Sequence, residues 1–310
     1  MMTPKEQIVS LLTGFSVEVT PASAAKVEDF STHLAAGTTV NVTFLPGSDI
    51  ADTIATCARL RREGFNPVPH IAARSLESAA HLERYLDGLA SEARIDEALV
   101  IGGGVTKPVG PYATSMQVLT SGLLEQYGVR SIGVAGHPEG SPDISDAEIR
   151  TALAEKNAWA RDTDAEVYIE TQFCFEADTI VAWERRIRAE GNTLPIHIGL
   201  PGLATLKTLL KFAQMSGVGP SIRVLTRQAR NITKLLMVQE PDLVVAGLAE
   251  AVAADPDSLL HKLHFYPFGG IAKTAAWLNA AATGNIQPKP KGGFTLLDAE
   301  ANAAPLRAAS

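Results

Sequence analysis

The residue whose setting most clearly suggests chemistry is Glu18, a carboxylate inside the short apolar run Phe15–Pro21. Successive side chains of a strand face opposite ways, so Glu18 points away from the face that Val17 and Val19 share. We expect the apolar face to pack against helices, which turns Glu18 inward. Burial disfavours a charged carboxylate, so a raised pKa is expected, as suits a general acid near neutral pH. A structural glutamate in a salt bridge is the alternative interpretation.

Other reactive or hydrogen-bonding side chains recur at the ends of strand-like runs. His70 fits either a functional site or a buried histidine bonded to backbone, and His137 lies in a turn where it could bind an anion or stack on a ring. The full set at these ends comprises Glu18, Thr43, His70, Gly102 to Gly104, His137, Gln172, Pro201 and Tyr266.

The glycine run at 102–104 matches neither common nucleotide motif. It lacks the lysine–serine ending of a phosphate-binding loop and the third glycine of a dinucleotide fingerprint. A tight turn with close backbone approach to protein or ligand is the plain interpretation. No metal site is expected, because His261 and His264 fall on opposite faces of a strand and no three ligands converge at suitable spacing.

The elements that must position these side chains alternate strictly between strand and helix patterns. Such alternation requires parallel strands, and eight units are the number that closes a barrel. We therefore predict an α/β fold, a single-domain (β/α)8 TIM barrel over residues 1–285, with a loosely ordered tail at 286–310; an open doubly wound sheet is the alternative. The predicted strands are Phe15–Thr20, Thr38–Phe44, Pro67–Ile71, Ala98–Gly102, Ser131–Gly136, Val167–Gln172, Pro195–Gly199 and Lys262–Tyr266.

The segments between these strands are rich in Ala, Leu, Glu and Arg. In addition, Ser221–Ala254 is long enough for two helices with a break at Glu240–Asp242, where Pro241 cannot continue a helix. The other predicted helices are Ser48–Glu63, Ser75–Ala90, Ala113–Tyr127, Ser145–Ala160, Ala177–Ala189 and Ala204–Met215.

Composition excludes several classes of protein. A net charge of -7 argues against non-specific binding of nucleic acid, which needs a basic face. The apolar runs are strand-sized, too short to span a bilayer, and the first residues lack the pattern of a signal peptide. Cys57 and Cys174 are too few for a disulfide framework and read as small buried apolar side chains. We expect a cytoplasmic protein.

Taken in chain order, the strand ends resemble the methylenetetrahydrofolate reductase family from about residue 14 to about residue 280. The motif Thr171-Gln172-Phe173-Cys174-Phe175-Glu176 is the most specific match. The other matching motifs are Phe15-Ser16-Val17-Glu18-Val19-Thr20-Pro21, Val40-Asn41-Val42-Thr43-Phe44, Val68-Pro69-His70-Ile71, Ile132-Gly133-Val134-Ala135-Gly136-His137-Pro138-Glu139-Gly140, Lys211-Phe212-Ala213-Gln214-Met215 and His264-Phe265-Tyr266.

The resemblance implies that NAD(P)H reduces bound FAD and that a one-carbon folate then takes the same site and accepts the hydride. Glu18 would be the general acid that protonates the folate nitrogen as the methylene bridge opens. Two alternatives stay open, direct hydride transfer without flavin and a non-catalytic folate-binding or partner subunit. The implied folate contacts are Thr43, Gln172 and Phe212, and the implied flavin contacts are His70, Gly102, Gly103, His137 and either Lys156 or Arg161.

The sequence departs from the family pattern where the fourth strand ends. The family has an aspartate there, near the flavin, and this chain has Gly103. Loss of that negative charge should raise the flavin's reduction potential. We hypothesise that Glu170, on the same strand face as Gln172, supplies the missing charge; a glutamate paired with an interior Arg, Lys or hydroxyl is the alternative.

Two further departures from the family pattern and two undetermined properties leave details open. The segment Asp146–Arg161 is about one helical turn longer than the family norm, and the eighth strand continues as Tyr266-Pro267-Phe268-Gly269-Gly270 where the family tends to have Thr-Leu-Asn. Both changes bear on flavin retention and substrate identity. The sequence does not decide between NADH and NADPH, and it leaves open whether the chain forms a homo-oligomer.

Overall fold

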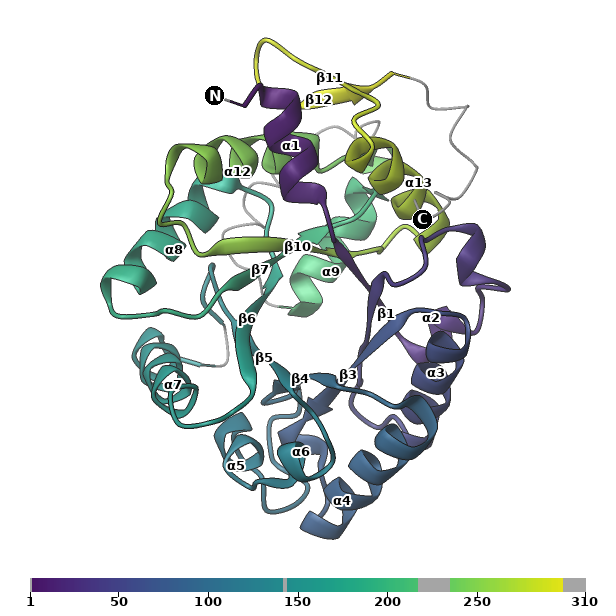
Figure 1. Cartoon of the computed structure of the whole chain (residues 1–310), viewed down its shortest axis with the longest axis vertical. Coiled ribbons are helices and arrows are strands. Elements are labelled where there is room, and N and C mark those ends of the chain that lie inside the picture. The colour runs from purple at the N-terminus through teal and green to yellow at the C-terminus, as the bar shows by residue number, and fades with distance from the viewer. Residues whose placement is uncertain (1, 142–143, 217–234, 298–310) are drawn as a thin grey trace.

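The computed structural model describes residues 2–141, 144–216 and 235–297. Its centre is a closed barrel of eight parallel strands, in the order β1-β10-β7-β6-β5-β4-β3-β2 (Figure 1). Each strand pairs in parallel register with both neighbours, because a helix or loop returns the chain to the same end after every strand. The predicted (β/α)8 barrel is confirmed.

The predicted strands agree with the observed ones to within two residues at either end. This agreement follows from the runs of Val and Ile, which suit strands buried between a barrel interior and a layer of helices. The barrel strands are β1 Ser16–Val19, β2 Thr39–Val42, β3 Asn66–Ala72, β4 Glu97–Ile101, β5 Ser131–Gly136, β6 Glu166–Phe173, β7 Ile196–Pro201 and β10 Leu260–Tyr266.

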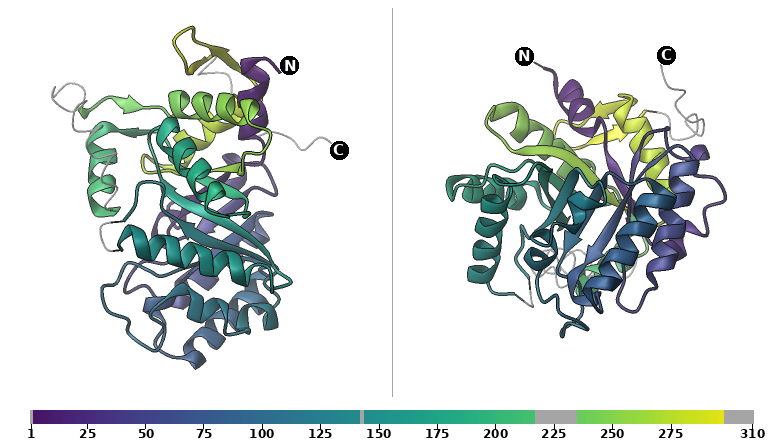
Figure 2. Two further views of the ribbon diagram at one scale, coloured as in Figure 1. Left: turned by 90° about the vertical axis from the view of Figure 1, so that its left-hand side faces the viewer. Right: turned by 60° about the horizontal axis from the view of Figure 1, so that its bottom comes forward.

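Helices flank the barrel as an outer layer (Figure 2). Many begin at a capping side chain; for example, Ser145 accepts a hydrogen bond from the Glu148 amide. The larger helices are α1 Pro4–Leu12, α3 Ile50–Arg62, α4 Ala79–Gly88, α7 Asp146–Trp159, α8 Ala177–Ala189, α9 Leu206–Ser216, α12 Asp242–Ala254 and α13 Ile271–Ala282.

One predicted helix differs from the observed structure, and another is described only in its second half. The helix expected over Ala113–Tyr127 is two short ones, α5 Ser115–Leu119 and α6 Leu123–Gln126, because Gly122 adopts a left-handed φ of 72° between them. The second helix expected within Ser221–Ala254 is α12, which begins after Pro241 as predicted. The first part of that segment lies outside the described residues.

The loosely ordered tail predicted for 286–310 is wrong over its first part. Residues Ile286–Pro288 (β11) and Phe294–Leu296 (β12) form an antiparallel hairpin. Phe294 is fully buried and its ring stacks on Trp277 at 5.3 Å, so a large apolar side chain fixes the hairpin to α13. Pro290, Gly292 and Gly293 lie in the turn of the hairpin, whereas Pro288 is the last residue of β11. Residues 298–310 lie outside the described part.

The barrel strands alternate between an apolar outer face and a polar inner face. Outward residues such as Val17, Val134 and Ile198 are fully buried against the helices. The inward positions include charged and hydrogen-bonding side chains, whereas barrels of this class are generally filled by branched apolar residues. The polar inward residues are Ser16, Glu18, Asn41, His70, Glu97, Tyr168, Glu170, His197, Lys262, His264 and Tyr266.

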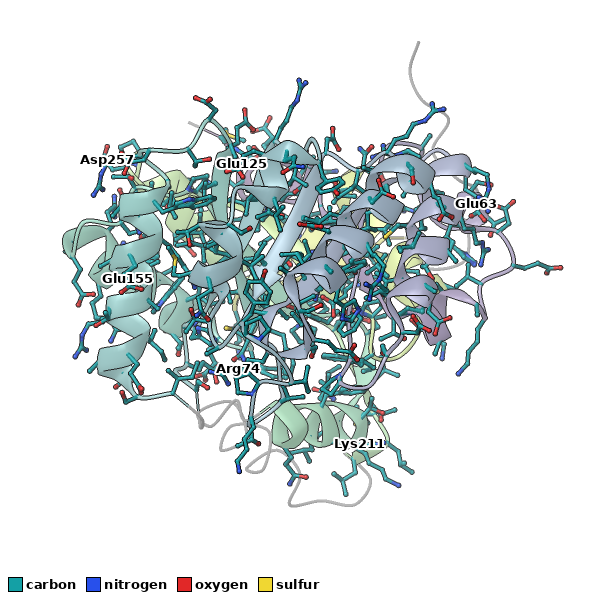
Figure 3. The ribbon with its side chains drawn as sticks, turned by 90° about the horizontal axis from the view of Figure 1, so that it is seen from below. Glu63, Arg74, Glu125, Glu155, Lys211 and Asp257 are labelled. Atoms are coloured by element: carbon teal, nitrogen blue, oxygen red, sulfur yellow. The ribbon has the colours of Figure 1, made fainter. Side chains whose placement is uncertain are left out.

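The carboxyl ends of the strands form one rim of the barrel, which we call the mouth. Helix α9 lies across this end, apart from the ring of outer helices, and Figure 3 shows its Lys211 at the same edge of the molecule as Arg74. Glu125 and Asp257 lie at the opposite edge (Figure 3). The inward side chains nearest the mouth are therefore the ones that a ligand can reach.

Candidate active site

Glu18 lies between two histidine side chains near the mouth of the barrel. Its Oε2 is 3.3 Å from Nε2 of His70 on β3 and 3.6 Å from Nε2 of His264 on β10. None of the three atoms has a partner in hydrogen-bond geometry, so both contacts are mainly electrostatic. The Glu18 side chain keeps 13% of its surface exposed, which leaves it accessible from the mouth.

The expectation of a raised pKa for Glu18 is wrong. Burial by itself raises the pKa of this carboxyl, but the charges of His70 and His264 and their contacts with Oε2 outweigh it. The pKa of Glu18 is therefore held well below its ordinary range. The sequence argument considered burial alone and did not anticipate two imidazoles against one carboxylate.

His264 is fully buried and is held by contacts on both of its ring nitrogens. Nδ1 lies 2.9 Å from the hydroxyl of Ser16 and 3.8 Å from Oε2 of Glu170, while Nε2 faces Glu18. The amide of Asn41 donates a hydrogen bond of 2.7 Å to Oε1 of Glu170. Burial lowers the pKa of His264, but the charges of Glu170 and Glu18 outweigh it, so the pKa of this imidazole is raised above its ordinary value.

The expectation that no three potential metal ligands lie close together is also wrong. Ligand-type atoms of Glu18, Glu170 and His264 all lie within 4.8 Å of one another. Strand register brings them together, since the three residues lie on β1, β6 and β10 and all face inward. The His264 ring lies between the two carboxylates, with Nε2 3.6 Å from Oε2 of Glu18 and Nδ1 3.8 Å from Oε2 of Glu170. The separation of His261 from His264 is confirmed, because His261 is exposed and His264 is fully buried.

Thr43 lies at the mouth, as the resemblance implies. Its amide donates to the Val19 carbonyl at 2.8 Å, which fixes the loop after β2 beside Glu18. The Thr43 hydroxyl oxygen is buried and has no hydrogen-bond partner in the described structure. Buried polar atoms are nearly always paired, so an unpaired hydroxyl at the mouth suits a ligand contact.

Aromatic side chains form the neighbouring wall of the mouth. Phe212 on α9 stacks on Phe268 at 4.1 Å, and Phe268 also packs against Phe173 and Tyr266. Gln172, the remaining predicted folate contact, is half-buried at the end of β6. The structure thus brings Phe212 and Gln172 to the mouth on the side of β6 and β10.

Two of the predicted flavin contacts lie together at the end of β5. Lys156 on α7 is 6% exposed, and its Nζ lies 3.4 Å from the Ala135 carbonyl without an ion pair among the described residues. Burial lowers the pKa of Lys156 to about 8. Burial and the charge of Lys156 lower the pKa of His137 to about 4, so its imidazole is neutral at pH 7.

The other predicted flavin contacts are divided between the two rims. Gly102 and Gly103 follow β4 at the mouth, and Gly102 accepts a hydrogen bond from the Arg74 amide. Arg161 follows the end of α7 in the loop that leads into β6, which places it at the opposite, amino-terminal rim. Between the two basic candidates, Lys156 is the one that can face a ligand in the mouth.

The residues at the end of β5 fit the phosphates of a dinucleotide such as FAD, because Lys156 is a desolvated cation that forms no ion pair within the described part of the chain. The fourth strand differs. Gly103 has a φ of +91°, and a Cβ added there would lie 3.2 Å from Cβ of Ala72. No acidic side chain faces a flavin from this position. Glu170 is engaged by Asn41 and His264, and that it also supplies the missing charge stays a prediction.

His264 and Asn41 are members of the site that sequence reasoning did not assign. Their signal was strand parity, because Asn41 shares a face with Thr43, and His264 shares one with Tyr266. A polar residue on the inward face of a barrel strand is a candidate for the interior. Neither residue stands out from its type alone.

Comparison with known proteins agrees with this architecture. The family model for methylenetetrahydrofolate reductase matches residues 33–266. A methylenetetrahydrofolate reductase of Schizosaccharomyces pombe is 35% identical over 88 residues, which are 28% of this chain and 14% of that protein. Because the family match spans most of the barrel, the chain belongs to the methylenetetrahydrofolate reductase family.

A solved structure shares the fold. It is that of an uncharacterised protein from Clostridium thermocellum which binds two copies of 5-methyl-5,6,7,8-tetrahydrofolic acid. The two align with a TM-score of 0.57 and 10% identity over 91% of this chain and 99% of that one. At this identity the likeness concerns the fold alone. Within the described residues, no helix has the length and apolar character needed to cross a bilayer.

Proposed function

We propose that this protein reduces 5,10-methylenetetrahydrofolate to 5-methyltetrahydrofolate with NAD(P)H as the source of hydride. The carrying observation is the carboxylate of Glu18, reachable from the mouth and flanked by two imidazoles. Family membership supports the choice of substrate. A carboxylate flanked by imidazoles suits the step in which the bridging nitrogen of the folate must be protonated as the methylene bridge opens.

The surrounding side chains suit a flat, polar substrate. Phe212 and Phe268 provide apolar ring surface, and the unpaired Thr43 hydroxyl offers a hydrogen bond. Gln172 carries an amide that can donate and accept at once, as a pterin edge requires. These groups would orient the folate so that its bridging nitrogen faces Glu18.

FAD is the carrier that the family pattern implies. His70, His137, Gly102, Gly103 and Lys156 are the residues that would hold it, with Lys156 toward the phosphates. When bound, FAD would take the hydride from NAD(P)H and release it to the folate.

A second candidate is direct transfer of hydride from NAD(P)H to the folate. It is supported by the backbone at Gly103, which offers no carboxylate to a flavin. The desolvated Lys156 suits the phosphates of a nicotinamide dinucleotide as well as those of FAD. The acid chemistry of Glu18 is the same in both candidates.

The test follows NAD(P)H oxidation with and without methylenetetrahydrofolate, in the wild-type protein and in Glu18→Gln. The variant should lose folate-dependent turnover by about 10²–10⁴-fold, the contribution of a general acid, while still binding the nucleotide. Thr20→Ala, at the same strand end, is a matched control that should stay active. Undiminished folate reduction in Glu18→Gln would contradict the proposal.

The two candidates are separated by the flavin content of the purified protein. A yellow protein that releases FAD supports the flavin-dependent reaction. A colourless protein that oxidises NAD(P)H only when folate is present supports direct transfer.

A further inference from the structure

The acid of the proposed reaction presents a difficulty. Glu18 must give up a proton, yet its pKa is held well below the ordinary range, so the side chain is ionised at rest. An acid that is almost never protonated cannot donate efficiently by itself. A proton therefore has to be held next to it, on a group that faces the same oxygen.

His264 is the neighbour built for this purpose. Its ring lies between two carboxylates, with Nε2 3.6 Å from Oε2 of Glu18 and Nδ1 3.8 Å from Oε2 of Glu170. Asn41 fixes Glu170 by the 2.7 Å hydrogen bond to its other oxygen. Opposite charges on both sides favour the imidazolium.

His70 lies closer to Glu18 but in a different setting. Among the described residues it has Glu18 as its only carboxylate within ion-pair distance. His264, by contrast, keeps a second carboxylate even after Glu18 has been neutralised by a proton. Only His264 therefore has a fixed charge behind it that is independent of the reaction.

The groups that face His264 come from every strand packed around it. The Tyr266 ring meets the imidazole edge-on at 4.9 Å and separates it from the aromatic wall, and Lys262 opposes its protonation. The facing groups are Ser16 and Glu18 on β1, His197 on β7, Glu170 on β6, and Lys262 and Tyr266 on β10 itself.

We propose that His264 is the proton store for Glu18, and that Glu170 is a positioning residue that keeps the proton on His264 between turnovers. The inference rests on the proposed function, since it names the source of the proton used there. It divides two roles between two residues: His264 holds the proton, and Glu18 contacts the substrate.

The step balances as follows. A proton moves from Nε2 of His264 to Oε2 of Glu18, and Glu18 passes a proton to the bridging nitrogen of the folate. The bond from that nitrogen to the methylene carbon breaks, and its electron pair stays on the nitrogen. The methylene carbon is reduced by the hydride from NAD(P)H, which becomes NAD(P)⁺, and His264 regains a proton from solvent through Glu18. Closing the 3.6 Å gap to a hydrogen bond of about 2.8 Å is a movement of under about 1 Å.

The first test observes the imidazole directly and needs no turnover. The full-length protein, with its histidines labelled with ¹⁵N, is titrated by NMR. In the wild-type protein His264 should stay protonated above pH 7, and Glu170→Gln should lower its midpoint by about one pH unit or more. Lys262→Met should raise the midpoint. A general disruption of the structure would not shift the midpoint in opposite directions in the two variants.

The matched control is Glu97→Gln. Glu97 is another inward carboxylate with restricted solvent access, and its neighbours are Tyr168 and Lys262 rather than His264. The variant makes the same chemical change and should leave the His264 midpoint within about 0.3 pH unit. A midpoint unchanged in Glu170→Gln, or a neutral His264 in the wild type at pH 7, would overturn the proposal.

The second test is kinetic. In Glu170→Gln, the decline of kcat/KM at high pH should begin at a lower pH than in the wild type. The ratio of activity at pH 8 to activity at pH 6 should therefore be about tenfold smaller. KM for the folate should be unchanged. Unaltered pH dependence would overturn the role of Glu170. If the wild type does not reduce the folate at all, the proposed function fails, while the NMR result still decides where the proton is held.

A third measurement addresses a metal ion as the occupant of the same space. Protein prepared with a chelator is titrated with Zn²⁺. No stoichiometric binding is expected. If the wild-type protein binds one Zn²⁺ per chain and the Glu170→Gln variant does not, the proposal that His264 stores a proton is overturned.

Discussion

His264 and His197 are two inward imidazoles on neighbouring strands of one barrel, and their environments shift their pKa values in opposite directions. His264 lies in register with Gly199, and His197 lies in register with Lys262, one layer further from the mouth. Burial lowers the pKa of both. For His264 the carboxylates of Glu170 and Glu18 reverse that effect, whereas for His197 the positive charge of Lys262 adds to it.

The comparison shows that the neighbours of a buried histidine decide its charge more than burial does. The upper layer holds a proton beside an accessible carboxylate. The lower layer is neutral at its histidine, and the His197 ring stacks on Tyr168 at 4.0 Å. Two layers with similar residue types therefore serve different purposes, proton supply near the mouth and packing of the barrel interior below it.

The largest expected effect comes from making the same substitution at both histidines. His264→Gln should reduce folate-dependent turnover by about 10²-fold or more, because Glu18 loses its proton source. His197→Gln should stay within about twofold of the wild type. Steady-state assays with NAD(P)H and methylenetetrahydrofolate measure both, and equal losses in the two variants would remove the functional distinction between the layers.

Lys156 extends the comparison to a buried cation that makes no ion pair among the described residues, although the charge of Glu155 partly offsets the effect of burial on its pKa. Its pKa of about 8, against the ordinary 10.5, means that the charged form costs folding free energy below pH 8, on the order of 3 kcal/mol. Lys156→Met should therefore raise the free energy of unfolding at pH 7 by up to about that amount, and the gain should shrink between pH 8 and 10.5. Urea denaturation at several pH values measures this effect.

The same Lys156→Met variant should bind its dinucleotide more weakly, since the phosphates lose their cation. Lys5→Met, an exposed lysine, is the control for a change of net charge. A variant that is more stable and binds equally well would show that Lys156 has no ligand role.

A smaller effect is expected on the acid side of stability. Because the pKa of His197 is lowered, the unfolded chain takes up a proton below pH 6.5 that the folded chain does not. Stability contributed by the neutral ring is present above pH 6.5 and lost as pH falls. His197→Gln should narrow the stability difference between pH 7.5 and pH 5 by about 1–2 kcal/mol, whereas His33→Gln, on the outside of the barrel, should not.

The smallest expected effect concerns Tyr266, which contacts His264 but not His197. Tyr266→Phe keeps the ring over His264 and removes the hydroxyl that donates to the Thr171 carbonyl at 3.0 Å. Stability should fall by about 1 kcal/mol, and the His264 midpoint should not move. A shifted midpoint would mean that the hydroxyl, and not the ring alone, contributes to the proton store.

The sequence predicted the barrel and its strand bounds because each strand carries an alternating pattern with an apolar outer face. The positions of Glu18 and Thr43 at the mouth follow from the same rule, as does the placement of chemistry at the carboxyl ends. The charge state of Glu18 could not be predicted in this way. It depends on His264, on the neighbouring strand β10, and on His70, on β3 beyond β2, which are far from Glu18 in the sequence and come near it only when the barrel closes.

The C-terminal hairpin and the choice of the basic flavin contact also could not be predicted from local sequence. Phe294 is buried only because Trp277 offers it a surface, and the choice between Lys156 and Arg161 depends on which rim each one occupies. Both facts belong to tertiary structure. Local pattern identified the segments but not their neighbours.

The hydroxyl of Tyr266 has a mechanical consequence. It ties β10 to β6, two strands that are not adjacent because β7 lies between them. This hydrogen bond resists widening of the barrel between β6 and β10, so we expect opening motions at the mouth to be larger on the remaining arc, from β1 through β2, β3 and β4 to β5. Amide hydrogens near the ends of β6, β7 and β10 should therefore exchange with solvent slowly and at similar rates, because these three strands move as one unit.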